Sequence, residues 1–249
     1  MKRSAGRHVL DVVRAVVLLV SLACCLVAAP ASALDAAPWD RVLRAHARGG
    51  GVDYASLASD PVARADLDRF LADVAGMPED APLASWIDAY NAIVVREIVR
   101  RWPIESVRSV SGFFDRARHR VARAERTLDD LEHRVIRARF RDARIHAALV
   151  CGARSCPALQ PRAFSASRDL DAELDRVTRE WLESERHLRV ERGAVRGSAI
   201  LTWYRADFER DGGTVIRWLR RHAPGRLSGI PDDTPVAELP YDWAVNAAR

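Results

Sequence analysis

The residues best suited to chemistry lie in one stretch, from Leu128 to Phe164. Glu132 falls in a run with the apolar spacing of a helix, and His146 falls in a short apolar run that is typical of a strand. Cys151 and Cys156 follow shortly after it. A carboxylate, an imidazole and two thiols are the groups from which nucleophilic and acid–base catalysis are built. We therefore expect the functional site in this stretch.

Cys156 is the candidate nucleophile. It precedes Pro157, an arrangement typical of the start of a helix. At such a start, free backbone N–H groups and the helix dipole favour a thiolate and can hold an oxyanion. With His146 as base and Glu132 or Asn91 as orienting group, Cys156 would form the site of a cysteine-dependent hydrolase or acyl-transfer enzyme. This arrangement is the first functional hypothesis.

A disulfide between Cys151 and Cys156 is the main alternative. An even pair of cysteines in an exported protein is typical of a bridge. The chain would then be a non-catalytic binding or scaffold domain, in which His146 and Glu132 satisfy each other in the core. A reversible redox bridge and a zinc site made by these residues are further alternatives, although the cysteine spacing is not C-x-x-C. We expect no cofactor and no bound metal.

The predicted elements decide which of these side chains can meet. A strand over residues 145–151 would place His146 and Cys151 on opposite faces, because side chains alternate along a strand. Cys156, beyond a turn at Gly152, could approach either face. Glu132 lies on the apolar stripe of a helix predicted over residues 128–140, where a carboxylate must be paired or protonated. It could therefore orient a histidine, act as an acid or base, or bind an arginine.

Asn91 lies on the longest apolar helix, which is predicted over residues 83–101 and stopped by Pro103. Its amide could hold a neighbouring loop or take part in catalysis. Its neighbour Tyr90 lies on the apolar face and is expected in the core.

The rest of the chain predicts an α+β fold, a single mostly helical domain with a small β-sheet. Further helices are expected over residues 39–47, 61–74, 167–182, 202–208 and 214–221. Further strands or hairpins are expected over residues 116–126, 187–190, 194–201 and 239–243.

Residues 1–33 have the pattern of a Sec-type secretory signal peptide. A positive start precedes the apolar run 15–29, and Ala31-Ser32-Ala33 is an A-x-A cleavage site. We expect residues 34–249 to be the globular domain, located in the periplasm or secreted. No later stretch is apolar enough to span a membrane.

The charge of the mature chain argues against nucleic acid as a partner. The whole chain has a formal net charge of +5, and removing four basic residues and one acidic residue with the signal peptide leaves +2. No phosphate-binding loop or nucleic-acid motif is present in the sequence. We expect the partner to be a small molecule or a peptide-like substrate.

Seven sequence blocks together resemble the DUF547 family, a domain of unknown function found in bacteria and plants. In chain order they are Val52–Tyr54, Trp86–Ala92, Leu128–His133, Arg144–Cys151, Cys156-Pro157, Trp203–Phe208 and Tyr241–Trp243. Asp88 replaces the first asparagine of the family's Asn-Ala-Tyr-Asn run, and Gly152-Ala153 replaces its Ala-Ser. The resemblance implies a domain identity for nearly the whole mature chain, but the family has no agreed activity.

Overall fold

The computed structural model describes residues 34–248, which belong to one compact unit. The predicted signal peptide, residues 1–33, lies outside the described residues and stays a prediction. In residues 34–248, no helix has the length and apolar character required to cross a membrane.

The fold is mostly helical with small sheets, which confirms the predicted α+β class. The described residues form nine α-helices: α2 Ala37–His46, α3 Tyr54–Ser59, α4 Pro61–Gly76, α5 Leu83–Val99, α6 Arg137–Phe140, α7 Leu170–Glu183, α8 Ala199–Trp203, α9 Arg205–Gly212 and α10 Val215–His222. A π-helix, Asp130–Ile136, leads into α6. Short 3₁₀ helices cover Val107–Ser109, Ala143–Ala147 and Phe164–Ala166.

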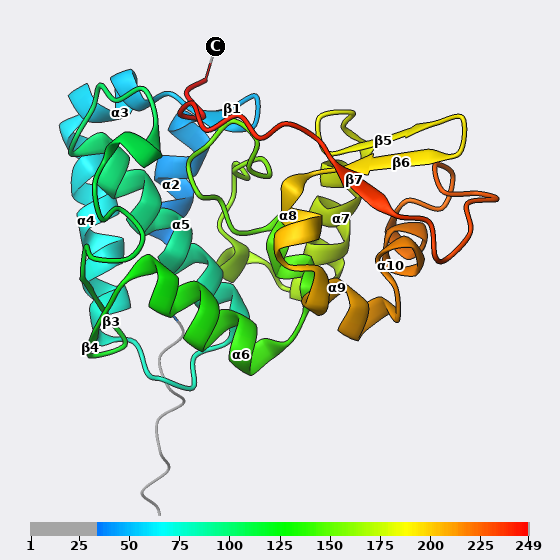
Figure 1. Ribbon diagram of the computed structural model, residues 1–249. Coiled ribbons are helices and arrows are strands. Elements are labelled where there is room, and N and C mark those ends of the chain that lie inside the picture. The colour runs from blue at the N-terminus through cyan, green and yellow to red at the C-terminus, as the bar shows by residue number, and fades with distance from the viewer. Residues whose placement is uncertain (1–33, 249) are drawn as a thin grey trace, which may run out of the picture. The chain divides into compact units, whose positions relative to one another are not determined.

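Helix α5 is the centre of the core. Nearly all of its side chains are buried, because it is packed against α3 and α4 as well as the π-helix (Figure 1). Helix α4 begins where the sequence predicts, since Pro61 stands in the first turn and Asp60 caps it by accepting from two backbone N–H groups.

The strands form three small sheets. Two are hairpins, β1 Ala47–Arg48 with β2 Gly51–Val52 and β3 His119–Val121 with β4 Ala124–Arg126. In the third, β5 Leu188–Glu191 pairs antiparallel with β6 Ala194–Gly197, and β6 pairs parallel with β7 Val236–Glu238. After β7 the chain runs back to the turn between β1 and β2 (Figure 1), where Val52 and Ala247 form an isolated bridge.

Several predicted elements are wrong. Residues 145–151 are not a strand: a 3₁₀ helix covers Ala143–Ala147 and an irregular segment follows. The side chain of Asn91 forms hydrogen bonds with the Ala148 carbonyl and the Val150 N–H. In a sheet, a neighbouring strand would bind these groups. No helix begins at Pro157. The final strand is β7, and the predicted strand 239–243 is an irregular segment instead.

The second strand of the third sheet is also shorter than predicted. It ends at Gly197 rather than Leu201, because the Ser198 side chain accepts from the Ile200 N–H and caps α8.

Candidate functional site

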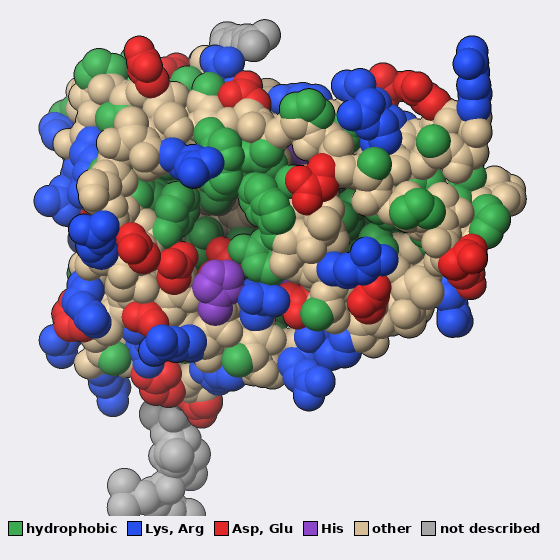
Figure 2. Space-filling model, viewed as in Figure 1, with side chains coloured by type: hydrophobic (Ala, Val, Ile, Leu, Met, Phe, Trp, Pro, Cys, Tyr) green, Lys and Arg blue, Asp and Glu red, His purple; other side chains and the backbone are tan. Residues whose placement is uncertain are grey.

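A cleft of about 610 Å³ holds most of the predicted site residues. Its walls come from segments far apart in the sequence: α5, the start of the π-helix, the 3₁₀ helix Ala143–Ala147, α8 and the C-terminal segment. Figure 2 shows a hollow lined by hydrophobic side chains, with acidic, basic and histidine side chains around it. The lining residues are Tyr90, Arg108, Phe114, Asp115, Asp129, Glu132, His133, His146, Leu149, Cys151, Cys156, Ile200, Trp203, Tyr204, Tyr241 and Trp243.

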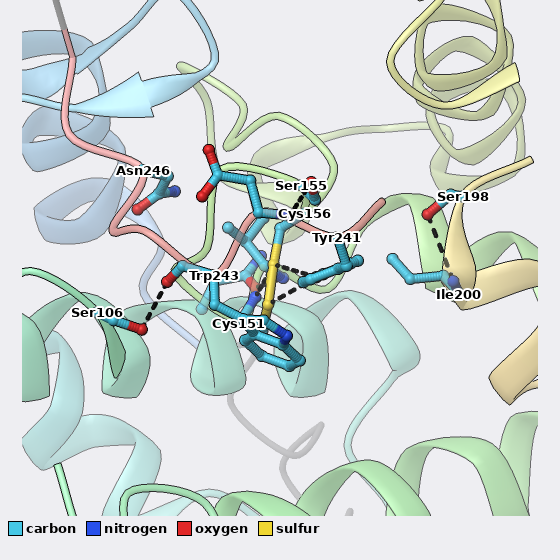
Figure 3. Close-up of a disulfide and its surroundings, with 12 residues drawn as sticks. Ser106, Cys151, Ser155, Cys156, Ser198, Ile200, Tyr241, Trp243 and Asn246 are labelled. Carbon is cyan, nitrogen blue, oxygen red and sulfur yellow. Dashed lines mark hydrogen bonds between the residues drawn. A yellow bond between two sulfur atoms is a disulfide. The ribbon is translucent and has the colours of Figure 1, made fainter. Parts of the chain in front are cut away.

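A disulfide joins Cys151 to Cys156 at the wall of this cleft (Figure 3). The hydroxyl of Tyr241 lies 3.3 Å from each sulfur. The backbone N–H of Cys151 is 3.1 Å from the Cys156 sulfur. The Cys156 side chain is buried, and Cys151 is half-buried. Neither sulfur is a free thiol, so the thiolate that the first hypothesis requires is not present in this state.

Two buried polar side chains of α5 hold the segment that carries the disulfide. The amide of Asn91 donates to the Ala148 carbonyl over 3.0 Å and accepts from the Val150 N–H over 2.9 Å. The carboxylate of Asp88 accepts from the backbone N–H groups of Phe164 and Ser165. Asn91 therefore holds a loop, as one of its two predicted roles requires, and lies behind the cleft rather than in it.

Burial raises the pKa of Asp88 to about 6, although its hydrogen bonds with Ser165 and Phe164 act in the opposite direction. Asp88 is one of the two departures from the usual family pattern, and Gly152-Ala153 is the other. Gly152 has a φ of +84°, and a Cβ there would lie 2.6 Å from Ile98 Cδ1. Glycine at this position therefore lets the chain turn directly after Cys151 against α5.

His146 is paired with a carboxylate that the sequence did not reveal as its partner. Its Nε2 lies 2.8 Å from Asp207 Oδ2, and its ring stacks on Tyr204 at 4.2 Å between centroids. Burial lowers the pKa of His146, while Asp207 and Glu132 act to raise it. Burial raises the pKa of Asp207, but hydrogen bonds from His146 and Arg137 outweigh it and hold that pKa well below its usual range. The sequence expected Glu132 or Asn91 in this orienting role.

Glu132 occupies the first turns of the π-helix and is half-buried. The Tyr90 hydroxyl donates to its carboxylate over 3.1 Å. Within the described residues Glu132 forms no ion pair, so the predicted arginine partner is not found. Three residues earlier, Asp129 also forms no ion pair with any described residue. Burial raises its pKa, His133 acts in the opposite direction, and Glu132 and Asp115 add to the rise. The wide turns of a π-helix are frequent at functional sites.

Aromatic rings form a second part of the lining. Trp203 stacks with Trp243 at 5.8 Å and lies 4.8 Å from the Tyr241 ring. Trp203 is 47% exposed, although a tryptophan this accessible is uncommon in a folded domain. The guanidinium of Arg108 lies over Trp243 at 5.0 Å. This part of the lining therefore offers flat aromatic faces to whatever enters the cleft.

The structure thus brings Glu132, His146, Cys151 and Cys156 to one cleft, despite the strand alternation that predicted His146 and Cys151 on opposite faces. The candidate site residues predicted from the sequence did not include Tyr204, Asp207, Tyr241, Trp243, Asp129 or Trp203. Five of these lie in the Trp203–Phe208 and Tyr241–Trp243 blocks, and Asp129 lies in the Leu128–His133 block. The blocks that carry the resemblance were therefore the signal that pointed to them. In residues 34–248 no group of three or more His, Cys, Asp or Glu side chains could hold a metal ion.

The fold and this cleft define a mostly helical α+β domain with a disulfide-bonded, aromatic-walled pocket. Residues 74–182 match the family described as "Protein of unknown function, DUF547", so this part of the chain is a DUF547 domain. The match confirms the resemblance and includes the α5 block, the π-helix and both cysteines. No curated protein and no solved structure matches the chain.

Proposed function

We propose that this is a ligand-binding domain whose cleft holds a positively charged group of a small or peptide-like molecule. The observation that carries this proposal is the pair of carboxylates, Asp129 and Glu132, which line the cleft without a cationic partner among the described residues. A carboxylate removed from water is costly unless it is paired. A ligand cation would supply the missing partner.

The aromatic part of the lining supports the same class of ligand. The faces of Trp and Tyr rings attract cations through their quadrupoles, by about 2 kcal/mol when the contact is desolvated. Arg108 already occupies one such position over Trp243. The cleft contains three carboxylates (Asp115, Asp129 and Glu132) against this one arginine, so its formal charge is negative with neutral histidines.

Choline and its uncharged isostere 3,3-dimethylbutanol provide a direct test, measured by isothermal titration calorimetry on the oxidised protein. We expect choline to bind at least tenfold more tightly than the neutral isostere, because about 1.4 kcal/mol of charge interaction is a factor of ten. Equal affinity for the two, or binding of neither, would contradict the proposal.

The variant Glu132→Gln keeps a hydrogen-bond acceptor for Tyr90 and removes the charge. We expect it to weaken choline binding about tenfold, consistent with about 1.4 kcal/mol for a half-buried ion contact. The exposed Glu191→Gln change removes the same charge from the β5–β6 hairpin and serves as the matched control.

A cysteine-dependent hydrolase in the reduced state is the second candidate. It is favoured by His146, which lines the same cleft as both sulfurs. Its pairing with Asp207 behind it resembles the base and orienting group of a catalytic triad. Hydrolysis of p-nitrophenyl acetate by protein reduced with dithiothreitol, and its loss in Cys156→Ala, would support this function. Equal rates with and without Cys156 would dismiss it.

We also propose that the chain is exported through residues 1–33. A disulfide is typical of an oxidising compartment, and the A-x-A site predicts cleavage after Ala33. N-terminal sequencing of the protein from an envelope fraction checks this: Leu34 is the expected first residue.

A further inference from the structure

A second cavity, of about 600 Å³, is bordered by the turn between β1 and β2, the C-terminal end of α7 and the chain end at residues 246–248. Apart from Cys156, it shares no residue with the aromatic cleft. The C-terminal segment that carries Asn246 also places Tyr241 against the disulfide (Figure 3). The proposed function does not use this cavity.

Three residues that line the cavity each hold a buried nitrogen without a hydrogen-bond partner in the described chain. They are Trp181 Nε1, His187 Nδ1 and Asn246 Nδ2, in side chains only 4%, 5% and 6% exposed. The Oδ1 of Asn246 accepts from the Tyr54 hydroxyl over 2.8 Å, and this pairing leaves the Nδ2 as the atom without a partner. A buried donor left unsatisfied costs about 1–3 kcal/mol, so three such donors in the lining favour a hydrogen-bond acceptor at this cavity.

The chemistry of these atoms restricts that partner. The indole N–H of Trp181 and the amide NH₂ of Asn246 can only donate, so the partner must carry acceptor oxygens. Burial lowers the pKa of His187 to about 4, with Arg186 adding to the shift, so its ring is neutral near pH 7. A neutral imidazole can present an N–H as a third donor.

The charged groups around the cavity favour an anion. Arg154 and Arg186 are the basic residues of its lining, and Glu180 is the acidic one. Glu180 is already bound by Arg176 over 2.5 Å. Arg154 lies 3.8 Å from the exposed Asp242, and Arg186 forms no ion pair within residues 34–248. Two arginines therefore border the cavity with little compensating negative charge.

We propose that this cavity is a second binding site, for a ligand that carries an oxyanion, a carboxylate or a phosphate group. The side-chain N–H groups of Trp181, His187 and Asn246 donate to its oxygens inside the cavity. Arg154 and Arg186 bind it at the border of the cavity, where the guanidinium fork matches both anions. The site is independent of the aromatic cleft, so either proposal can fail without the other.

Calorimetry with inorganic phosphate and with acetate tests the site, at constant ionic strength set with sodium chloride. We expect saturable binding of at least one anion, and the stronger one identifies the ligand class as phosphate or carboxylate. The Arg154→Gln, Arg186→Gln double variant should weaken it at least fivefold. Arg64→Gln with Arg120→Gln removes two exposed arginines far from the cavity lining and should change nothing. Absence of binding, or equal loss in both double variants, overturns the proposal.

Two tryptophan variants test the contribution of the buried donors separately from that of the arginines. Trp181→Phe removes the indole N–H of a residue that lines the cavity, and Trp39→Phe removes another buried indole N–H that lies elsewhere in the core. We expect Trp181→Phe alone to weaken anion binding about threefold or more. The ring nitrogens of His187, followed by nuclear magnetic resonance, should titrate at higher pH when the anion is bound. If both tryptophan variants bind equally and His187 does not shift, the anion lies outside the cavity and the proposal fails.

Discussion

The aromatic cleft and the second cavity meet at Cys156 but offer opposite chemistry to a ligand. The cleft contains flat ring faces and carboxylates without a cation, and its rim includes the exposed Trp203. The cavity contains buried N–H donors and two arginines. In the cleft and in the cavity, the polar groups without a partner in the fold indicate the charge and hydrogen-bonding groups that a ligand would need. The volumes of the cleft and the cavity are nearly equal, so volume does not indicate which ligand each would bind. The unsatisfied polar groups differ, and they do indicate it.

The two sites depend on one wall, the segment from Ala148 to Ser165. Helix α5 holds it through Asn91 at its start and Asp88 at its end. The disulfide closes the turn between these two anchors. Changes to this wall should therefore affect both sites, whereas changes to the outer walls should affect one.

The largest expected effect comes from Asn91→Leu. It leaves the buried Ala148 carbonyl and Val150 N–H without partners, so we expect the free energy of unfolding to fall by about 4 kcal/mol. Urea denaturation measures this, and both choline and phosphate affinities should fall together. A loss below about 1 kcal/mol would show that the wall does not depend on α5.

The second prediction concerns the pH dependence that His187 gives to the cavity. Its pKa of about 4 in the fold lies below the ordinary 6.5, so the unfolded chain binds more protons between these values. Stability therefore rises with pH through this window, by about 3 kcal/mol from this residue, and is fully present above pH 6.5. His187→Gln should remove that part of the rise in urea denaturation curves.

His133 is the matched control, because it is exposed and borders the cleft instead. His133→Gln controls for the replacement of an imidazole by an amide away from the cavity. Similar profiles in the two variants would mean that His187 is not the neutral buried group described above.

The third prediction concerns the disulfide, which borders both sites. Replacing Cys151 and Cys156 by serine removes a short closed loop, so we expect a loss of about 2 kcal/mol in unfolding free energy. Because Cys156 lines the cleft and the cavity, both affinities should weaken modestly. Retention of full affinity at both sites would show that the bridge stabilises the fold alone.

The smallest effect is expected from Trp203→Ala. This variant separates the two proposed sites best, because Trp203 lines the cleft and not the second cavity. Its ring is half exposed and packs mainly on Tyr241 and Trp243. We expect choline to bind about fivefold more weakly, a loss of about 1 kcal/mol, with phosphate affinity unchanged. A matching loss for phosphate would mean that the two sites are not independent.

Much of the fold could be predicted from the sequence. The helices beginning at Pro61 and Leu83 and the hairpin around Ala122 are present as expected, because apolar periodicity, proline and capping residues act locally. The wrong predictions concern segments whose backbone is bound by a side chain that is distant along the chain. Residues 145–151 have strand-like composition, yet the amide of Asn91 binds their backbone and no strand forms.

The candidate site could be predicted in part. Glu132, His146, Cys151 and Cys156 were found because their residue types in one short stretch are unusual and chemically capable. Asp207 could not be assigned to His146, since 61 residues separate them and many other acids stood as candidates. The three unpaired donors of the second cavity could not be predicted from the sequence either. Whether a donor has a partner depends on which groups the whole fold places next to it.

By itself, the sequence determined the helical class, the family and the residue types near the cysteines, because these follow from local patterns. Only the tertiary structure decided that His146 is paired with Asp207, that the thiols form a bridge beside Tyr241, and that Cys156 borders both the cleft and the second cavity. The physical reason is that hydrogen bonds, stacking and burial join segments distant along the chain. Their partners are set by packing rather than by spacing.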